Sequence, residues 1–354
     1  MNKTSIGIIG CGKIAIDKHL PNLVNIPGVE VIGFSNRTQS KADAAREKFG
    51  TTSAKTYKDP YALINDPNID VVHVCTSNQS HAAYTIAALN ANKHVMVEKP
   101  MATNAKDAKA MLDAAKANKK LLSVSYQNRF DADIQALKSL VDKNTLGEIY
   151  YTKIHAVRRR GVPTWGTFLN KTIQGGGPLI DVGTHALDLA LWVTGDYDVD
   201  YVVGSTYRKL HKDTPAGNLW GAWDPSDFEV EDSAFAMIKM RSGSTLIIEA
   251  SYALNTRHSK ENKITLHGTK GGADLDDGLT LNFSEDNMLK TKKIKTSQND
   301  LGALEMQHWI DAIKADKQPL VKAFEAYQVT RIIDAIYASA EQNKPIYLNQ
   351  EASD

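Results

Sequence analysis

The sequence predicts an α/β protein with two domains: residues 1–126 with a parallel sheet, and residues 127–354 with an α+β fold and an open, mainly antiparallel sheet. Up to about residue 126, short β-branched runs alternate with alanine-rich stretches, a pattern typical of right-handed βαβ crossovers. Beyond that point, longer runs alternate polar and apolar residues, as expected of strands with one solvated face.

Six buried strands are expected in the first domain, with helices in the intervals between them. The expected strands are Ser5–Gly10, Val29–Ser35, Ser53–Tyr57, Val71–Thr76, Val95–Glu98 and Leu121–Tyr126. The expected helices are Ala42–Phe49, Ala82–Asn90 and Ala105–Asn118, the last with an apolar stripe of Ala108, Met111, Leu112 and Ala115. Such a stripe packs a helix against the sheet.

The second domain is expected to begin with a helix and to continue mainly as strands. The expected elements are a helix over Ile134–Lys143, strands Ile149–Arg160, Ala234–Met240, Thr245–Ala253 and Lys263–Gly268, and an amphipathic helix over Phe324–Ala340. Pro178 opens a further helix that continues through Trp192 and stops at Gly195, because proline suits a first helical turn. The polar segment 284–299 is interpreted as a hairpin edge or a loop.

The amino-acid composition indicates which class of binding partner to expect. The 42 Lys and Arg residues nearly balance the 41 Asp and Glu residues, so bulk charge favours neither nucleic acid nor a membrane surface. The two cysteines form neither a disulfide framework nor a zinc pattern. No signal-peptide core follows Met1, and no apolar run approaches the ~18 residues of a membrane span. We expect a cytoplasmic protein with a small-molecule partner.

A glycine-rich turn follows the first strand: Gly10-Cys11-Gly12-Lys13-Ile14-Ala15. The first glycine permits a tight turn, and the second lets the backbone approach a pyrophosphate at the positive end of the next helix. Ala15 stands where the helix packs closely. The pattern predicts a dinucleotide-binding Rossmann domain, with Gly10, Gly12, Lys13 and Ile14 as cofactor contacts.

The choice between cofactors depends on the end of the second strand, which reads Ser35-Asn36-Arg37-Thr38. An acidic residue here would bind the ribose 2′-hydroxyl of NAD. Instead, Arg37 is suited to pair with a 2′-phosphate, while Asn36 can hydrogen-bond a plain ribose. NAD(H) and NADP(H) therefore both remain open. The alternative for Arg37 is a solvated surface arginine.

Polar residues follow the fourth strand, where open α/β sheets bind ligands at their carboxyl edge. The predicted cofactor contacts there are Thr76, Ser77, Asn78 and His81, and three further contacts are Glu98, Lys99 and Gln127. His81 has an alternative interpretation, in which it caps or packs the following helix.

Lys99 follows an apolar run and precedes Pro100, so it stands at a strand mouth. Asp181 and His185 are four residues apart and share one helical face. Removing hydride from an alcohol requires a base for the hydroxyl proton and a cation beside the developing alkoxide. His185 would take the proton, Lys99 would stabilise the oxygen, and Asp181 would orient the substrate or Lys99. A hydrogen-bonded pair on a solvated helix is the alternative, and a metal site lacks a third ligand.

Three arginines and an indole are candidate substrate contacts. Arg158 and Arg160 face one side of their strand, and Trp165 follows in a loop. Arg129 lies at the junction between the predicted domains, a preferred place for a cleft. The alternative is a set of outer-face arginines and a core tryptophan.

Together these segments resemble the Gfo/Idh/MocA oxidoreductase family. The residues that carry the likeness are the glycine turn, Thr76-Ser77-Asn78 with His81, Glu98-Lys99-Pro100, Tyr126-Gln127-Asn128-Arg129-Phe130, and Asp181 with His185. The resemblance implies a C-terminal sheet that pairs subunits into dimers or tetramers, and Lys99, Asp181 and His185 as a catalytic trio. The segments 158–166 and 175–181 are similar to a branch containing scyllo-inositol dehydrogenases. Ser35-Asn36-Arg37 departs from the family, because NAD-using members commonly carry an acidic residue there.

The sequence thus predicts a dehydrogenase that oxidises a secondary alcohol of a cyclic polyol or sugar, with scyllo-inositol as the first substrate to try and myo-inositol as the second. In this hypothesis Lys99 and His185 meet beside the nicotinamide. The alternatives are an aldose or keto-sugar oxidoreductase, an NAD-assisted glycoside hydrolase and a non-catalytic dinucleotide sensor.

Overall fold

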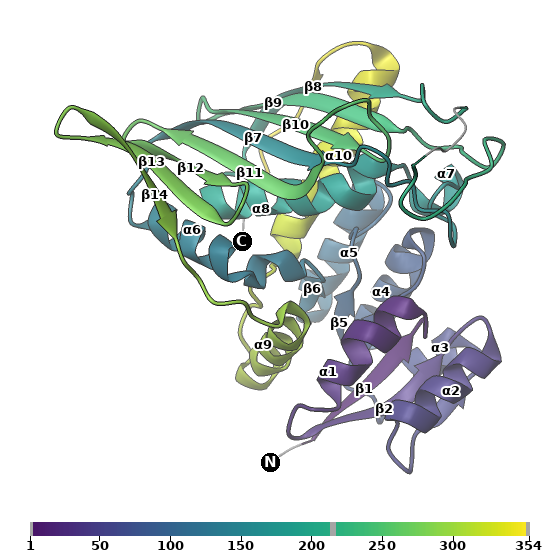
Figure 1. Cartoon of the computed structure of the whole chain (residues 1–354). Helices are drawn as coiled ribbons and strands as arrows, with labels where there is room; N and C mark the ends of the chain where they lie inside the picture. Colours follow the sequence, from purple (N-terminus) through teal and green to yellow (C-terminus); the bar gives the residue numbers. More distant parts are fainter. Residues whose placement is uncertain (1–2, 213–216, 352–354) are drawn as a thin grey trace. The chain divides into compact units, whose positions relative to one another are not determined.

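The computed structural model describes residues 3–212 and 217–351, and the chain divides into two compact units. The first unit comprises residues 3–127 and 300–327, and the second comprises the other described residues. Figure 1 labels many of the helices and strands of both units.

The first unit contains a six-stranded parallel sheet in the order β3-β2-β1-β4-β5-β6. The strands are β1 (Thr4–Ile9), β2 (Val29–Ser35), β3 (Lys55–Tyr57), β4 (Val71–Val74), β5 (His94–Val97) and β6 (Leu122–Val124). All the predicted strands are present, although several are shorter than expected. The strand order reverses between β1 and β4, and such a switch point is where open α/β sheets bind ligands at their carboxyl edge.

Helices connect these strands as predicted. They are η1 (Ala15–His19), α1 (Leu20–Leu23), α2 (Gln39–Phe49), α3 (Pro60–Ile64), η2 (Asn78–Ser80), α4 (His81–Asn90) and α5 (Ala105–Asn118). The predicted stripe of α5 is buried. The Asn104 side chain caps this helix by accepting a hydrogen bond from the Asp107 N–H, which satisfies one of the unpaired donors of the first turn.

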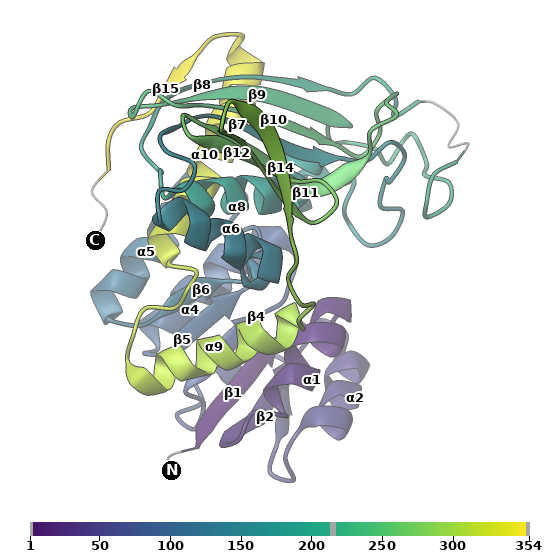
Figure 2. The same cartoon turned by 60° about the vertical axis from the view of Figure 1, so that its left-hand side comes forward.

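The segment α9 (Leu301–Ala315) returns to the first unit late in the chain. Its residues Met306, Trp309 and Ile310 belong to the same buried cluster as Ile8 and Phe34, and Figure 2 shows the helix beside the sheet of this unit. The predicted division between residues 126 and 127 did not include this segment, because an amphipathic pattern does not reveal which core a helix covers.

The second unit is built on a nine-stranded sheet in the order β14-β13-β12-β11-β7-β10-β9-β8-β15. The strands are β7 (Ile149–Val157), β8 (Val199–Tyr207), β9 (Ser233–Met240), β10 (Thr245–Ser251), β11 (Lys260–Gly268), β12 (Gly271–Leu275), β13 (Leu279–Glu285), β14 (Met288–Ile294) and β15 (Ile346–Tyr347). The sheet is mainly antiparallel as predicted, but β7 and β10 pair in parallel. The alternation of polar and apolar residues indicates which face of a strand is solvated, but it does not indicate whether neighbouring strands run parallel or antiparallel. Segment 284–299 contributes β14 to a hairpin.

Helices lie on one face of this sheet (Figures 1 and 2). Apart from α9, the helices and helical turns after residue 126 are η3 (Gln127–Phe130), α6 (Ala132–Asp142), α7 (Lys171–Gln174), η4 (Leu179–Gly183), α8 (Thr184–Thr194) and α10 (Ala323–Gln342). The helix predicted to open at Pro178 begins with the wide π-type turn η4 and continues as α8, which ends at Gly195 with a φ of +71°.

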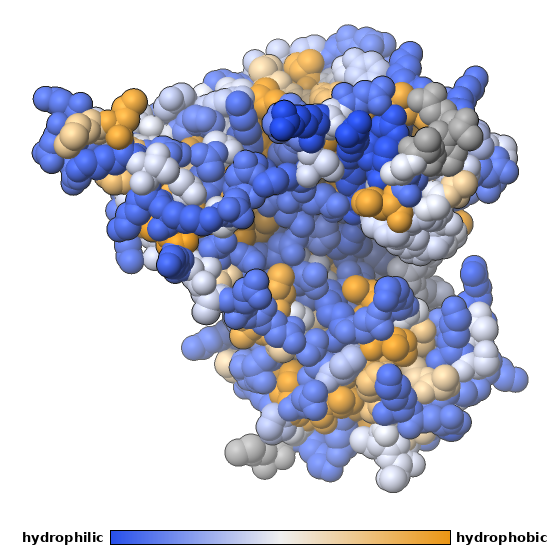
Figure 3. Space-filling model, viewed as in Figure 1, coloured by the Kyte–Doolittle hydropathy of each residue, from blue (hydrophilic) through white to orange (hydrophobic). Residues whose placement is uncertain are grey.

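The visible surface is mainly hydrophilic, with small hydrophobic patches between polar residues (Figure 3). In the described part of the chain, no helix is long and apolar enough to cross a membrane.

Candidate functional site

The glycine turn follows β1 in the chain and packs against the end of β4. A Cβ atom at Gly10 would lie 2.4 Å from the Cys75 carbonyl oxygen, and its φ is +96°, so only glycine fits this position. A Cβ at Gly12 would meet nothing within 4 Å. Ile14 is 38% exposed, whereas Ala15 is fully buried. The turn therefore has the close packing and the open side that a dinucleotide pyrophosphate needs at a helix N-terminus.

Asn36 links the end of β2 to the glycine turn through a hydrogen bond. Its Oδ1 accepts a hydrogen bond from the Cys11 N–H at 3.0 Å, and its Nδ2 donates to the Thr38 carbonyl at 3.0 Å. The neighbouring Arg37 is exposed, and no acidic side chain within residues 3–212 and 217–351 pairs with it. Lys13 is also exposed and forms an ion pair with Asp17.

His81 has the packing role that was the alternative interpretation of this residue. The ring is fully buried, with Nδ1 2.8 Å from the Pro100 carbonyl oxygen and Nε2 3.1 Å from the Thr76 carbonyl oxygen. Burial lowers the pKa of His81, so the neutral ring donates to one of these carbonyls. The prediction that His81 contacts the cofactor is therefore corrected: the buried ring lies between the loops that contain Thr76 and Pro100 and connects them. Thr76, Ser77 and Asn78 remain partly exposed at the carboxyl end of β4.

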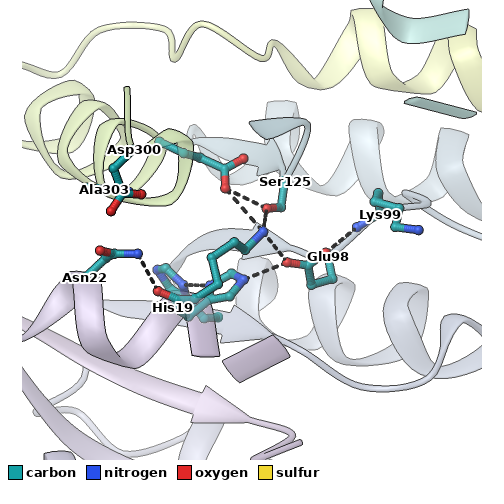
Figure 4. Close-up of polar contacts among 10 residues, drawn as sticks. His19, Asn22, Glu98, Lys99, Ser125, Asp300 and Ala303 are labelled. Atoms are coloured by element: carbon teal, nitrogen blue, oxygen red, sulfur yellow. Dashed lines mark hydrogen bonds and ion pairs between the residues drawn. The ribbon is translucent and has the colours of Figure 1, made fainter. Parts of the chain in front are cut away.

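Glu98 is directed into the protein interior, which corrects the prediction that it contacts the cofactor (Figure 4). The residue is 6% exposed. Its Oε1 lies 2.6 Å from Lys18 Nζ and 2.7 Å from His19 Nε2, and its Oε2 accepts a hydrogen bond from the backbone N–H of Lys99 at 3.2 Å. The carboxylate thus fixes the backbone of Lys99, whose side chain points away from this cluster in Figure 4.

Two further chains of hydrogen bonds extend from Glu98. Lys18 Nζ also lies 2.5 Å from Ser125 Oγ, which donates to Glu305 Oε2 at 2.8 Å. On the other side, His19 Nδ1 lies 2.9 Å from His73 Nδ1. Because a carboxylate only accepts, His19 donates through Nε2 to Glu98.

Burial and neighbouring charges determine the protonation of Lys18, Glu98 and Glu305. Burial alone would lower the pKa of Lys18, but the carboxylates of Glu305 and Glu98 raise it above its usual value. Burial opposes ionisation of Glu98, yet the Lys18 charge holds the pKa of Glu98 well below its usual range. Burial raises the pKa of Glu305, which makes Glu305 the carboxyl group that retains its proton most readily. Lys18 and Glu98 are therefore a buried ion pair.

The sequence prediction missed Lys18, His19, His73, Ser125 and Glu305. A usable signal existed for one of them. His73 lies inside the apolar run of β4, where all four residues are buried, and a histidine at such a position needs a polar partner. Lys18 gives no such signal, because its burial, with only 8% of the residue exposed, becomes evident only in the structure.

In the second unit, Asp181 and His185 lie on the accessible side of the η4–α8 segment. Both are partly exposed, whereas every other residue from Val182 to Ala190 is buried. The Tyr252 hydroxyl donates a hydrogen bond to Asp181 Oδ2 at 2.8 Å. Burial and the Asp181 charge raise the pKa of Tyr252 well above its usual value, so Tyr252 remains a donor. Sequence reasoning did not identify Tyr252.

The candidate substrate residues have different environments. Arg158 forms two hydrogen bonds to Glu261, at 2.6 and 2.8 Å, and Arg160 donates to Asn255 Oδ1 at 2.7 Å. Trp165 is 48% exposed, so the core alternative for this indole is wrong.

Arg129 is corrected from a substrate contact to a structural residue. Its side chain is fully buried, and its guanidinium forms hydrogen bonds to both Asp188 oxygens at 2.6 to 3.2 Å. A fully desolvated guanidinium requires such a bidentate partner. In the described residues, no group of three or more His, Cys, Asp or Glu side chains is arranged to hold a metal ion.

Known proteins resemble this chain along nearly its whole length. It is 34% identical to a D-glucoside 3-dehydrogenase of Escherichia coli over 97% of both chains. It is 25% identical to a myo-inositol 2-dehydrogenase of Thermotoga maritima over 98% of both chains. Among solved structures, a levoglucosan dehydrogenase in complex with NADH and levoglucosan has a TM-score of 0.82 at 23% identity, covering 99% of this chain and all of the other.

Two family descriptions match consecutive parts of the sequence. "Oxidoreductase family, NAD-binding Rossmann fold" matches residues 4–126, and "Oxidoreductase family, C-terminal alpha/beta domain" matches residues 138–348. The glycine turn and the parallel sheet agree with the first description, and the cofactor is accordingly NAD(H) or NADP(H). The chain therefore belongs to the Gfo/Idh/MocA family of NAD(P)-dependent oxidoreductases.

Proposed function

We propose that this protein is a dehydrogenase that oxidises a secondary ring hydroxyl of a glucoside, or of another sugar or cyclic polyol, with NAD⁺ or NADP⁺. The observation that carries the proposal is the placement of Asp181 and His185 on one accessible helical face, with Asp181 held by Tyr252. The relative at 34% identity favours a glucoside, whereas the sequence prediction put scyllo-inositol first. Inositols are second here, supported by the relative at 25% identity.

The proposed chemistry assigns one task to each polar group. A bound oxidised nicotinamide supplies a hydride acceptor. His185 takes the hydroxyl proton, and the Lys99 ammonium stabilises the negative charge that develops on the oxygen. Asp181 orients the substrate hydroxyl. Gly10, Gly12 and Ile14 hold the dinucleotide, and Asn36 and Arg37 select its ribose.

The experiment is a substrate screen that follows the absorbance of the reduced nicotinamide with both cofactors. The panel contains methyl β-D-glucopyranoside, scyllo-inositol, myo-inositol and free aldoses. We expect oxidation of a glucoside or an inositol. In the Lys99→Met variant, kcat should fall by roughly 10²- to 10⁴-fold, while dinucleotide binding is retained.

Two outcomes would contradict the proposal. One is a complete panel in which no ring alcohol reduces either cofactor. The other is a Lys99→Met variant with wild-type turnover. Release of phenol from an aryl glycoside without net formation of reduced cofactor would instead indicate the redox-assisted hydrolase, and tight dinucleotide binding without any turnover would indicate a sensor.

We also propose that the protein is a homodimer or homotetramer joined through the uncovered face of the large sheet. On β8, β9 and β10 the register places Val203, Met237 and Ile247 in one apolar row across that face, and all three are partly or largely exposed. Such a row favours burial against a second copy. Sedimentation of the wild type and of Met237→Glu tests the assembly.

Both cysteines are free and buried, which fits a reducing cytoplasm.

A further inference from the structure

Two indoles of the second unit are exposed side by side. Trp165 is 48% exposed and Trp220 is 40% exposed, and their ring centroids lie 4.9 Å apart in an edge-to-face arrangement. Phe168 packs against the Trp165 ring at 5.8 Å. Tryptophan usually buries most of its large surface, so two neighbouring rings left open to solvent indicate a ligand surface. We call Trp165 and Trp220 the indole pair.

The loops that carry the indole pair are bonded to each other. Asn218 Oδ1 accepts a hydrogen bond from the Val162 N–H at 2.9 Å, and its Nδ2 donates to the Val162 carbonyl at 3.1 Å. Thr164 Oγ1 donates to the Trp220 carbonyl at 2.5 Å, and the Leu219 N–H donates to the Arg160 carbonyl at 3.2 Å. The rings are thus held in place before any ligand arrives, which reduces the entropic cost of binding.

The indole pair is connected to the candidate catalytic residue through two side chains. The Arg158 guanidinium stacks on the Trp220 ring, 5.1 Å from its centroid, and lies 5.7 Å from the centroid of the Tyr252 ring. Tyr252 in turn donates to Asp181. Only the side chains of Arg158 and the buried Tyr252 therefore separate Asp181 from the indole pair, and a second ring attached to the oxidised sugar is the part of a substrate that would extend from Asp181 towards the pair.

The charge of the arginine that stacks on the pair is already neutralised. Arg158 is the cation stacked on Trp220, and its guanidinium is already paired with the Glu261 carboxylate, so its charge is not available to a phosphate or another anion. Flat apolar ring faces suit indole surfaces, because C–H groups pack against the negative face of the aromatic ring.

We propose that the indole pair is a subsite for the aglycone of a glycoside, an uncharged second ring attached to the sugar that is oxidised. The inference rests on the proposed function and extends it: the substrates are glycosides with a ring-shaped aglycone, and inositols and methyl glycosides occupy only part of the site.

The test compares phenyl β-D-glucopyranoside and cellobiose with methyl β-D-glucopyranoside. The wild type should show a higher kcat/KM for the two-ring substrates, mainly through KM. Trp220→Ala and Trp165→Ala should each reduce the ratio of kcat/KM between phenyl and methyl glucoside by roughly tenfold. Tyr150→Ala removes an aromatic ring that is 51% exposed elsewhere in the same unit, and this control should leave the ratio unchanged.

Three results would overturn the subsite. One is a wild type that oxidises ring alcohols but has no preference for two-ring glycosides, which leaves the proposed function standing. Another is an equal loss on both glucosides in the indole variants. The third is a change in oligomeric state of these variants on gel filtration, which would show that the pair contacts a second copy.

A different readout applies if no ring alcohol is oxidised and the proposed function fails. Phenyl β-D-glucopyranoside is then titrated against the tryptophan fluorescence of the whole chain. Saturable quenching that is lost in Trp220→Phe supports the subsite, and quenching that persists in that variant, or no quenching at all, contradicts it.

Discussion

Lys18 Nζ lies 2.6 Å from Glu98 Oε1 inside the first unit, and the two side chains are only 10% and 9% exposed. Lys18 comes from the helix that follows the glycine turn, and Glu98 directly precedes Lys99. The ion pair therefore connects the helix after the glycine turn to the proposed catalytic lysine through groups that are largely shielded from water.

Replacing Glu98 by Gln should destabilise the protein strongly. The substitution leaves the Lys18 ammonium buried beside Glu305 without its closest carboxylate, and breaking one side of a buried pair costs about 3–5 kcal/mol. Chemical denaturation of the wild type and the variant measures the difference in unfolding free energy.

A surface pair provides the control. Lys3 and Glu30 form an ion pair with side chains 67% and 29% exposed, so Glu30→Gln should cost at most about 1 kcal/mol. A Glu98→Gln loss no larger than that of Glu30→Gln would show that burial of the Lys18–Glu98 pair has no energetic consequence.

Glu305 predicts a particular pH dependence of stability. Burial raises the pKa of Glu305 in the folded state above the usual value of 4.5. The folded state then holds a proton that the unfolded state has released, so the stability contributed by this group is present at low pH and is lost as pH rises through the raised pKa. Glu305→Gln removes this titration.

The measurement is the unfolding free energy of both proteins at several pH values above 4.5. The wild type should lose stability relative to Glu305→Gln as the pH rises. Two curves that run parallel would show that Glu305 titrates alike in the folded and unfolded protein.

Arg37 is expected to determine the response to NADP⁺. Its exposed guanidinium is suited to pair with a 2′-phosphate, so Arg37→Ala should lower kcat/KM for NADP⁺ by about tenfold or more relative to NAD⁺. Lys41→Ala, which removes a nearby exposed cation on α2, should leave the ratio between the cofactors unchanged. The same strong preference for NAD⁺ before and after the Arg37 substitution would remove Arg37 from the site.

We expect Tyr252 to be a positioning residue that acts through Asp181. Tyr252→Phe keeps the buried ring and removes the hydrogen bond of 2.8 Å to Asp181 Oδ2, so kcat should fall by about tenfold with little change in stability. In an Asp181→Asn background the same substitution should have almost no further effect, because its target is already altered. Full additivity of the two losses would assign Tyr252 an independent role.

His185 is tested through the pH profile of kcat/KM. If His185 is the base, activity falls at acidic pH because the imidazole becomes protonated. His185→Ala should lose most activity, should lack this acidic limb, and should recover part of its turnover with added imidazole. An unchanged profile in the variant would exclude His185 as the base.

The regular elements of the fold follow from local patterns in the sequence. β2 and α5 have the predicted boundaries, because β-branched runs and an alanine-rich amphipathic stretch each determine their own periodicity. The parallel pairing of β7 with β10 and the return of α9 to the first unit depend on contacts between distant segments, and local periodicity contains no information about them.

In the candidate site, too, local patterns identify some residues, while others depend on contacts between distant segments. Gly10 could be placed because its position in the turn has a fixed steric requirement. Glu98 and Arg129 appeared accessible in the sequence, but their charges are buried against Lys18 and Asp188, partners far away in the chain. Tyr252 was not identified, because a tyrosine directly after a strand gives no local sign that its hydroxyl reaches a carboxylate.

The position of α9 has a consequence for biosynthesis. Met306, Trp309 and Ile310 fill the same core as Ile8 and Phe34, so translation must proceed beyond residue 310 before the N-terminal sheet can be fully covered. During this interval the apolar surface that α9 later covers remains exposed to solvent.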